Sequence, residues 1–397
     1  MSTTAPATRM VRAGIERLLG EDRALLTGSR VALVSNPASI DGRLRHAADL
    51  LADDPEINLV ALFGPQHGFR SDLQDNMIET PHGADRRRQV PIYSLYSETR
   101  EPTAEMLRDV DVLVIDLQDV GTRVYTYIYT MANCMRAAAR HGVRVVVCDR
   151  PNPVGGVAVE GPALRPEYSS FVGQYPIPLR HGLTIGEIAR LFNQEFSIGA
   201  ALDIVQLDGW HRPMYFDETG LPWVIPSPNL PTLDSVIVYP GAVLFEGTML
   251  SEGRGTTRPF ELLGAPWIDG DALAAAMNSR GLAGVHFRPV FFEPTFQKHA
   301  RQTCGGCQLH VLDREAFQPV RVAVELLDEF RRQDPSSFAW RQPPYEYEHD
   351  KWPIDILYGS DRLRTAFNRD EGAAALTASW GAEEDAFRRL RERYLLY

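Results

Sequence analysis

Four short runs of Val, Ile and Leu in the N-terminal part of the chain constrain its fold more than any other feature. They are RVALVS at 30–35, NLVALF at 58–63, VDVLVIDL at 110–117 and VRVVVCD at 143–149, and polar or turn-forming residues follow each one. Continuous apolar runs of this kind are typical of strands buried on both faces of a parallel sheet. Helical periodicity at 43–51 and 128–141 supplies crossover connections. The pattern predicts an α/β fold with a Rossmann-like, doubly wound parallel sheet.

The character of the sequence changes near residue 162. Pro and Gly become frequent, as in YPIP at 175–178. Further helices are predicted at 184–196, 270–279 and 318–334, and a strand at 306–312. The first of these helices has Thr184 as an N-cap three residues before Glu187. We expect a Rossmann-like catalytic domain over 1–162 and a smaller C-terminal α/β domain over 163–397 that closes the active-site cleft.

Charge and composition argue against several classes of function. The net charge is −11, and the longest basic run is Arg86-Arg87-Arg88, whereas a nucleic-acid-binding face needs a basic patch. No stretch approaches the roughly 20 apolar residues of a membrane span. Residues 1–10 lack the basic start and apolar core of a secretion signal, so we predict a cytoplasmic protein.

The four cysteines are too few and too unevenly placed for a disulfide framework. Cys304 and Cys307 enclose two glycines, which we interpret as small residues in a turn beside a strand. A metal or redox site, with His299 and His310 as partners, is the alternative. We expect neither a metal nor another cofactor.

Ligands of doubly wound sheets bind beyond the carboxyl ends of the strands, and polar clusters follow the second, third and fourth apolar runs there. The chain has no GxGxxG after the first strand and no phosphate-binding GxxxxGK motif. A dinucleotide or P-loop nucleotide site is therefore not expected.

The loop after the second run carries an unusual density of polar side chains. Residues 63–79 include Gln66, His67, Arg70 and, at the end, Glu79. Buried polar groups each need a partner, so loops rarely hold this many for packing alone. The cluster favours a functional loop, with a solvated surface loop as the alternative.

A second cluster follows the third run. Asp116 ends the strand, where a carboxylate is partly desolvated and suited to acid–base chemistry. The polar residues after it are Gln118, Asp119, Arg123, Tyr125 and Tyr127. Tyrosine rings suit stacking on a sugar face or hydrogen bonding to its hydroxyls. An Asp–Arg pair that only ties the turn down is the alternative.

The third cluster spans 244–260. Glycines flank Glu252 and Arg254, and a backbone without side chains can approach a ligand closely. With Glu246 the loop holds two acids and an arginine, which suit a polyhydroxylated, anionic substrate. A glycine-rich surface loop is the alternative.

With these segments in view, the chain resembles the NamZ-type exo-β-N-acetylmuramidases. The matching stretches cover nearly the whole chain in order: 64–69, 116–123 with 125–127, 149–153, 160–162, 170–173, 178–182, 226–231, 239–241, 250–257, 289–299 and 359–363. The resemblance implies a Rossmann-like domain that holds the active site and a smaller C-terminal domain. It also implies hydrolysis of terminal β-linked N-acetylmuramic acid from the non-reducing end of peptidoglycan fragments, without a metal or redox cofactor.

Two departures from the family pattern matter. Many members carry Glu in a Gly-Pro-Glu-His-Gly loop, where this chain has Gln66, and an amide cannot act as a general acid. Glu79, at the end of the same loop, is our candidate for that role. Many relatives are exported, so secretion is the alternative to a cytoplasmic location.

Glycoside hydrolysis needs one acid for the leaving oxygen and a second group on the other face of the ring. We assign Glu79 as the acid, Asp116 or Asp119 as its partner, and His67 and Gln118 as orienting residues. Candidate substrate-binding residues are Gln66, Arg70, Gln118, Arg123, Tyr125, Tyr127, Asn152, His181, Asn229, Glu252 and Arg254. The stereochemical course stays open, because an acetamido sugar can also supply its own nucleophile.

Two other functions compete with this one. A deacylase would need a metal cluster or an activated nucleophile, and the chain has neither a GxSxG nor a HExxH motif. A protein that binds muropeptides or amino sugars without turnover is the second, and Gln66 keeps it open.

Overall fold

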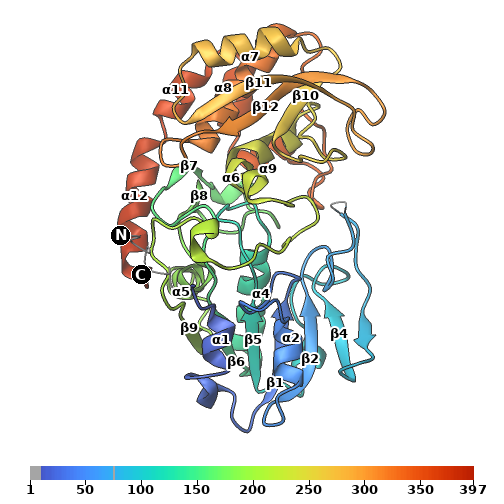
Figure 1. Cartoon of the computed structure of the whole chain (residues 1–397), viewed down its shortest axis with the longest axis vertical. Helices are drawn as coiled ribbons and strands as arrows, with labels where there is room; N and C mark the ends of the chain where they lie inside the picture. The colour runs from blue at the N-terminus through green and yellow to red at the C-terminus, as the bar shows by residue number, and fades with distance from the viewer. Residues whose placement is uncertain (1–9, 75–76) are drawn as a thin grey trace, which may run out of the picture.

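A seven-stranded sheet forms the centre of the structure, a computed structural model that describes residues 10–74 and 77–397 (Figure 1). The strand order is β3-β4-β2-β1-β5-β6-β9, and all neighbours are parallel except β3 and β4. The strands are β1 (Arg30–Ser35), β2 (Asn58–Gly64), β3 (Gly83–Asp85), β4 (Val90–Ser94), β5 (Val112–Asp116), β6 (Arg144–Cys148) and β9 (Leu202–Val205). The chain reverses its direction of winding between β1 and β5, as in Rossmann-like sheets. The predicted doubly wound fold is confirmed.

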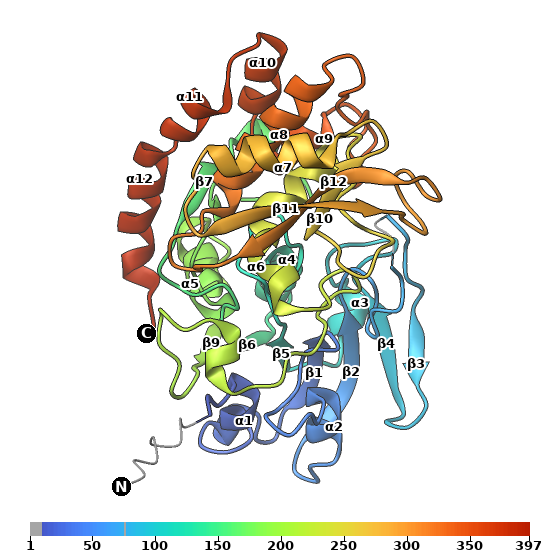
Figure 2. The same cartoon turned by 45° about the horizontal axis from the view of Figure 1, so that its top comes forward.

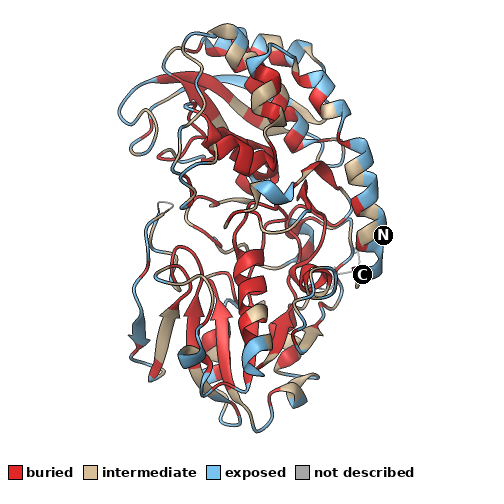
Figure 3. Cartoon of the chain, turned by 180° about the vertical axis from the view of Figure 1, so that it is seen from behind, coloured by how far each residue is buried: buried red, intermediate tan, exposed pale blue. Residues whose placement is uncertain are grey.

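Helices cover both faces of this sheet. The helices α1 (Gly14–Leu18) and α2 (Ala47–Ala52) pack on one face, and α4 (Tyr127–His141) and α5 (Ile185–Glu195) pack on the other. Successive strand residues enter the two cores alternately: Val31 and Leu33 face the first, and Ala32 and Val34 the second. This burial on both faces is why the strands are continuously apolar (Figure 3).

A second layer lies over the carboxyl edge of the sheet (Figure 2). Its three-stranded antiparallel sheet has the order β10-β12-β11, with α7 packed against β11 and β12, and α8 packed against α6 and α7. The elements are α6 (Leu233–Ala242), β10 (Leu262–Ala265), α7 (Gly270–Ser279), β11 (Val285–Phe292), β12 (Cys304–Val311) and α8 (Pro319–Gln333). The C-terminal helices then lead the chain back beside the Rossmann-like part, where the Tyr397 hydroxyl donates to Asp149 at 2.7 Å.

The remaining elements are shorter or lie around these layers. They are α3 (Ala104–Leu107), the pair β7 (Glu160–Ala163) and β8 (Pro178–Arg180), α9 (Pro353–Tyr358), α10 (Arg362–Asn368), α11 (Ala373–Ala378), α12 (Gly381–Arg391), and the 3-10 helices η1 (Arg23–Leu25), η2 (Pro166–Tyr168), η3 (Phe216–Thr219), η4 (Val243–Gly247) and η5 (Glu392–Tyr394).

Two expectations differ from the structure. The central sheet continues past the predicted domain boundary at 162, because β9 pairs with β6 and forms its last strand. Cys304 and Cys307 lie within β12 rather than in a turn. The glycines between them have a packing reason, since a Cβ on Gly306 would lie 2.0 Å from the carbonyl oxygen of Leu263 in the neighbouring strand.

Candidate active site

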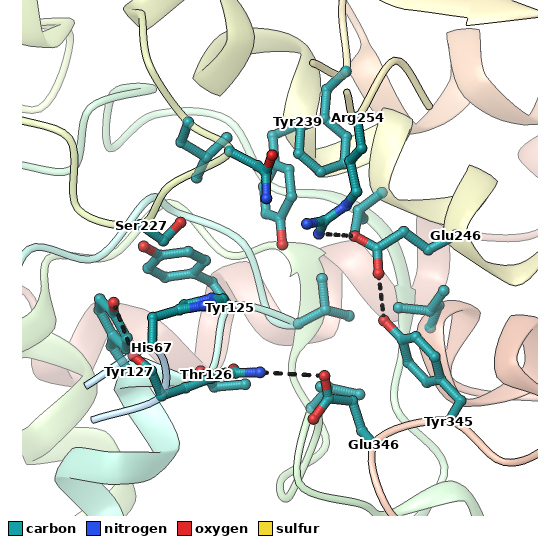
Figure 4. A pocket seen from close by; sticks show the side chains of 18 residues that line it. His67, Tyr125, Thr126, Tyr127, Ser227, Tyr239, Glu246, Arg254, Tyr345 and Glu346 are labelled. Carbon is teal, nitrogen blue, oxygen red and sulfur yellow. Dashed lines mark hydrogen bonds and ion pairs between the residues drawn. The ribbon is translucent and has the colours of Figure 1, made fainter. Parts of the chain in front are cut away.

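A buried polar pocket lies at the carboxyl edge of the central sheet, with about 500 Å³ of space that includes its opening to solvent (Figure 4). The loops after β2 and β5 form one side, and the segments 227–260 and 345–357 form the other. Its polar lining comprises Gln66, His67, Tyr125, Thr126, Tyr127, Ser227, Asn229, Tyr239, Glu246, Arg254, Tyr345 and Glu346. This edge is where ligands of doubly wound sheets bind.

The loop after β2 turns sharply to bring Gln66 and His67 into the pocket. Gly64 permits the turn, because a Cβ there would lie 2.4 Å from the backbone nitrogen of Phe69. His67 has φ +71°, and its Nδ1 donates to the carbonyl oxygen of Leu73 at 2.7 Å. The backbone geometry and this hydrogen bond fix the imidazole in place.

Gln66 connects the two sides of the pocket. Its Oε1 accepts a hydrogen bond from Thr126 Oγ1 at 2.8 Å, so Nε2 points the other way. That nitrogen donates to Tyr96 Oη and to Glu346 Oε1, both at 3.2 Å. The amide therefore has a fixed orientation and presents its donor to a carboxyl group.

Glu346 is a buried carboxyl group on the wall opposite the sheet, 3% exposed. Its Oε2 accepts from the Tyr96 hydroxyl at 2.7 Å. Burial raises the pKa of Glu346, and the hydrogen bonds from Tyr96 and Gln66 offset this effect only in part. This environment therefore makes Glu346 easier to protonate than an exposed glutamate.

Glu246, in η4, has the opposite electrostatic environment. Burial alone raises its pKa, but the adjacent Arg254 guanidinium and the Tyr345 hydroxyl outweigh burial and lower the pKa overall. Arg254 Nη2 donates to Oε1 at 2.7 Å, and Tyr345 Oη donates to Oε2 at 2.7 Å. The pocket thus holds two carboxyl groups whose pKa values are shifted apart.

Arg254 reaches the pocket from a loop with glycines on both sides of it. These glycines were predicted to let a ligand approach, and the structure shows another reason for them. A Cβ on Gly253 would lie 2.6 Å from the carbonyl oxygen of Leu262, and one on Gly255 would lie 2.5 Å from that of Phe296. The glycines therefore admit neighbouring protein backbone rather than a ligand. Glu252 lies behind Arg254, with 3.4 Å between Oε1 and Nε, and does not line the pocket.

Of the predicted site residues, the pocket lining contains Gln66, His67, Tyr125, Tyr127, Asn229 and Arg254. The two tyrosine rings pack edge to face with their centroids 4.7 Å apart. The Tyr127 hydroxyl donates to the carbonyl oxygen of Pro226 at 2.9 Å. Asn229 Nδ2 donates to the carbonyl oxygen of Gln74 at 3.1 Å.

The predicted catalytic carboxylates lie outside the pocket lining. Asp116 is fully buried and forms a two-pronged ion pair with Arg150, at 2.5 and 2.8 Å, which ties β5 to the loop after β6. Asp119 accepts from the backbone nitrogen of Gly121 at 2.7 Å and lies 3.4 Å from Nε2 of His181. The Glu79 side chain is 53% exposed and lies 3.7 Å from the Arg100 guanidinium.

Other predicted binding residues hold backbone in place. Arg123 is fully buried and donates to the carbonyl oxygens of Pro162, Ile177 and Leu357. Gln118 donates to the carbonyl oxygens of Asp119 and Pro151, and Asn152 donates to that of Leu183. His181 Nδ1 accepts from the backbone nitrogen of Leu183 at 3.1 Å. Arg70 is exposed.

Five pocket residues were not predicted from the sequence: Ser227, Tyr239, Glu246, Tyr345 and Glu346. Glu246 lies in the cluster at 244–260, and Ser227 and Tyr239 lie in the matching stretches 226–231 and 239–241, so these segments carried a signal. Glu346 lies in the polar stretch RQPPYEYEHD at 341–350, 280 residues from the amide that contacts it. The alternation of Tyr and Glu there was the available sign.

Across residues 10–74 and 77–397, no group of three or more His, Cys, Asp and Glu side chains is placed to hold a metal ion. Over the same residues no helix is long and apolar enough to cross a membrane. A polar pocket with two carboxyl groups of opposed pKa shift, beside aromatic rings, is the kind of site that carbohydrate-active hydrolases use.

Comparisons with known proteins identify the family. Residues 31–234 match the model "Exo-beta-N-acetylmuramidase NamZ, N-terminal", and residues 237–397 match the corresponding C-terminal model. The peptidoglycan β-N-acetylmuramidase NamZ of Bacillus subtilis is 46% identical over 387 residues, which are 98% of this chain and 91% of that protein. The chain therefore belongs to the NamZ exo-β-N-acetylmuramidase family, and the resemblance inferred from its sequence is confirmed.

Two solved structures, both DUF1343-family proteins of Bacteroides fragilis, share the fold. One has a TM-score of 0.87 and 35% identity, covering 99% of this chain and 100% of its own. The other has a TM-score of 0.75 and 28% identity, covering 98% and 99%. The family models divide the chain between residues 234 and 237, which assigns β9 to the same segment as the rest of the central sheet.

Proposed function

We propose that this protein is an exo-acting glycoside hydrolase that releases terminal β-linked N-acetylmuramic acid from the non-reducing end of peptidoglycan fragments. Its family and its 46% identical relative, named a peptidoglycan β-N-acetylmuramidase, support this activity over binding without turnover.

The observation that carries the catalytic assignment is the opposed pKa shift of two carboxyl groups in one pocket. Glycosidases use one protonated acid and one ionised carboxylate. Glu346, whose pKa is raised, is the proton donor to the leaving oxygen in this proposal. Glu246, whose pKa is lowered, stays ionised and stabilises positive charge that develops on the sugar ring. Glu346 takes the role that the sequence suggested for Glu79, because the Glu79 carboxylate is half exposed and lies outside the pocket lining.

Gln66 then has a role that an amide can fill. Its Nε2 donates to Glu346, and its Oε1 is held by Thr126, so it orients the acid without titrating itself. Where many family members have a glutamate at the position of Gln66, this chain therefore has one titratable group, Glu346, instead of two.

Arg254 is the proposed ligand of the lactyl carboxylate, which distinguishes N-acetylmuramic acid from N-acetylglucosamine. It lines the pocket beside Tyr239, and its guanidinium group points into the space in Figure 4. A planar guanidinium can bind a carboxylate through two parallel hydrogen bonds. Tyr125, Ser227 and Tyr239 supply hydroxyls for the rest of the sugar.

Incubation with a chromogenic β-N-acetylmuraminide tests the activity. Steady release of the chromophore is expected. Saturable binding of N-acetylmuramic acid without release would instead establish a binding protein. The predicted cytoplasmic location, with secretion as its alternative, stays a prediction that cell fractionation would test.

A further inference from the structure

Arg254 lies between two buried glutamates. Glu246 is bound to its Nη2 at 2.7 Å, and Glu252 lies 3.4 Å from its Nε. The side chains of both glutamates are less than 5% exposed. These three groups alone would carry a net charge of −1 and would repel an anionic sugar.

Lys298 supplies the fourth charge. Its Nζ donates to Glu252 Oε2 at 2.7 Å and to the carbonyl oxygens of Phe245 and Leu250, both at 2.8 Å. These contacts use all three of its donors, and the residue does not line the pocket. Its charge therefore acts on the site through Glu252 rather than by contact with a ligand.

The sequence supports a specific need for lysine at this position. The chain has only two lysines, Lys298 and Lys351, among 41 basic residues. A compact ammonium group fits three acceptors that converge on one atom, whereas the planar guanidinium fork of arginine does not. The segment is also held close to the loop of Arg254, because Thr295 donates from both its backbone nitrogen and its hydroxyl to the carbonyl oxygen of Gly255, each at 2.9 Å.

We propose that Lys298 sets the preference of this site for an anionic sugar by neutralising Glu252, so that Arg254 remains available to the substrate carboxylate. The proposal rests on the proposed role of Arg254. With Lys298 present, the set of Glu246, Arg254, Glu252 and Lys298 has zero net charge. Without it, the set is negative and opposes the lactyl carboxylate. Lys298 is a specificity-determining residue that acts through its neighbours.

Binding of free sugars by titration calorimetry separates this proposal from catalysis. The variants are Lys298→Met, the charge-neutral double variant Glu252→Gln/Lys298→Met, and Lys351→Met as a control. Lys351 is the other lysine, is outside the pocket lining and pairs with Glu348 at 3.5 Å. Dissociation constants for N-acetylmuramic acid and N-acetylglucosamine are compared as a ratio.

Lys298→Met should weaken binding of N-acetylmuramic acid relative to N-acetylglucosamine by about ten- to twentyfold, which is the size that Coulomb's law gives for two unit charges about 10 Å apart at an effective dielectric constant near 20. The double variant should recover the wild-type ratio to within about twofold. Lys351→Met should leave it unchanged.

Equal weakening of both sugars by Lys298→Met, or a double variant as unselective as the single one, would overturn the proposal. If Lys298→Met does not fold, the double variant alone tests the proposal. Its net charge equals that of the wild type, so a loss of selectivity in it would show that selectivity does not depend on the balance of charge. Wild-type protein that prefers N-acetylmuramic acid without hydrolysing the chromogenic substrate would refute the proposed activity and leave this inference standing. Wild-type protein that does not prefer N-acetylmuramic acid would refute the proposed role of Lys298.

Discussion

Removal of the Arg254 side chain should affect stability and substrate selectivity by separable amounts. In Arg254→Ala, Glu246 loses the 2.7 Å ion pair and keeps the Tyr345 hydroxyl, while Glu252 keeps Lys298. Breaking a buried pair from one side typically costs about 3–5 kcal/mol. Because both glutamates retain a partner, we expect a loss near the lower limit, about 3 kcal/mol in the free energy of unfolding.

The effect on selectivity is additional. A desolvated pair between Arg254 and the lactyl carboxylate should contribute about 2–5 kcal/mol to the binding of N-acetylmuramic acid. N-acetylglucosamine lacks this carboxylate and should lose much less. Arg254→Lys keeps the charge without the planar fork, so its discrimination should be intermediate.

The assay is kcat/KM on a chromogenic β-N-acetylmuraminide and on the matched glucosaminide, with urea unfolding of each variant. Arg212→Ala is the control, because Arg212 forms a comparable 2.7 Å pair with the buried Glu187 and does not line the pocket. It should lose stability and keep the substrate ratio. If Arg254→Ala lowers both activities in parallel, Arg254 is structural and another residue binds the carboxylate.

Two other predictions concern pH and metals. Burial raises the pKa of Glu160 to about 7, above its unfolded value, so its contribution to stability is complete at low pH and is lost as pH rises through about 7. Glu160→Gln should therefore reduce the fall in unfolding free energy between about pH 5 and pH 8, and an unchanged slope would contradict this assignment. EDTA should leave hydrolysis unchanged, whereas loss of activity that zinc or magnesium restores would require a metal-assisted mechanism.

The sheet was well predicted because strands that are buried on both faces appear in the sequence as continuous apolar runs. The apolar runs at 30–35, 58–63, 110–117 and 143–149 all coincide with strands to within two residues, and α4 and α5 lie within one residue of their predicted limits. The Thr184 cap forms as predicted, with the Glu187 side chain returning to the Thr184 backbone nitrogen. Short strands carried less information: β4 contains a proline, and β9 has only four residues.

The site was less predictable because its chemistry depends on contacts between distant segments. Asp116 looked like a catalytic acid at the end of a strand, but Arg150 from the next loop engages both its oxygens. Glu346 lies in a polar stretch where Tyr and Glu alternate, but nothing in that stretch indicates its partner, and only the folded chain brings it to Gln66. A sequence pattern records which face of an element is buried, and it does not record which loops meet across a pocket.

Comparison of Glu346→Gln with Glu79→Gln tests which of the two glutamates is the general acid. The measurement is kcat for aryl β-N-acetylmuraminides whose leaving groups differ in pKa. Loss of the general acid should lower kcat by about 10²–10⁴ for a poor leaving group, and much less for one that departs without protonation. We predict this pattern for Glu346→Gln and near-wild-type rates for Glu79→Gln. The reverse result, with Glu79→Gln inactive and Glu346→Gln active on all substrates, would contradict the account.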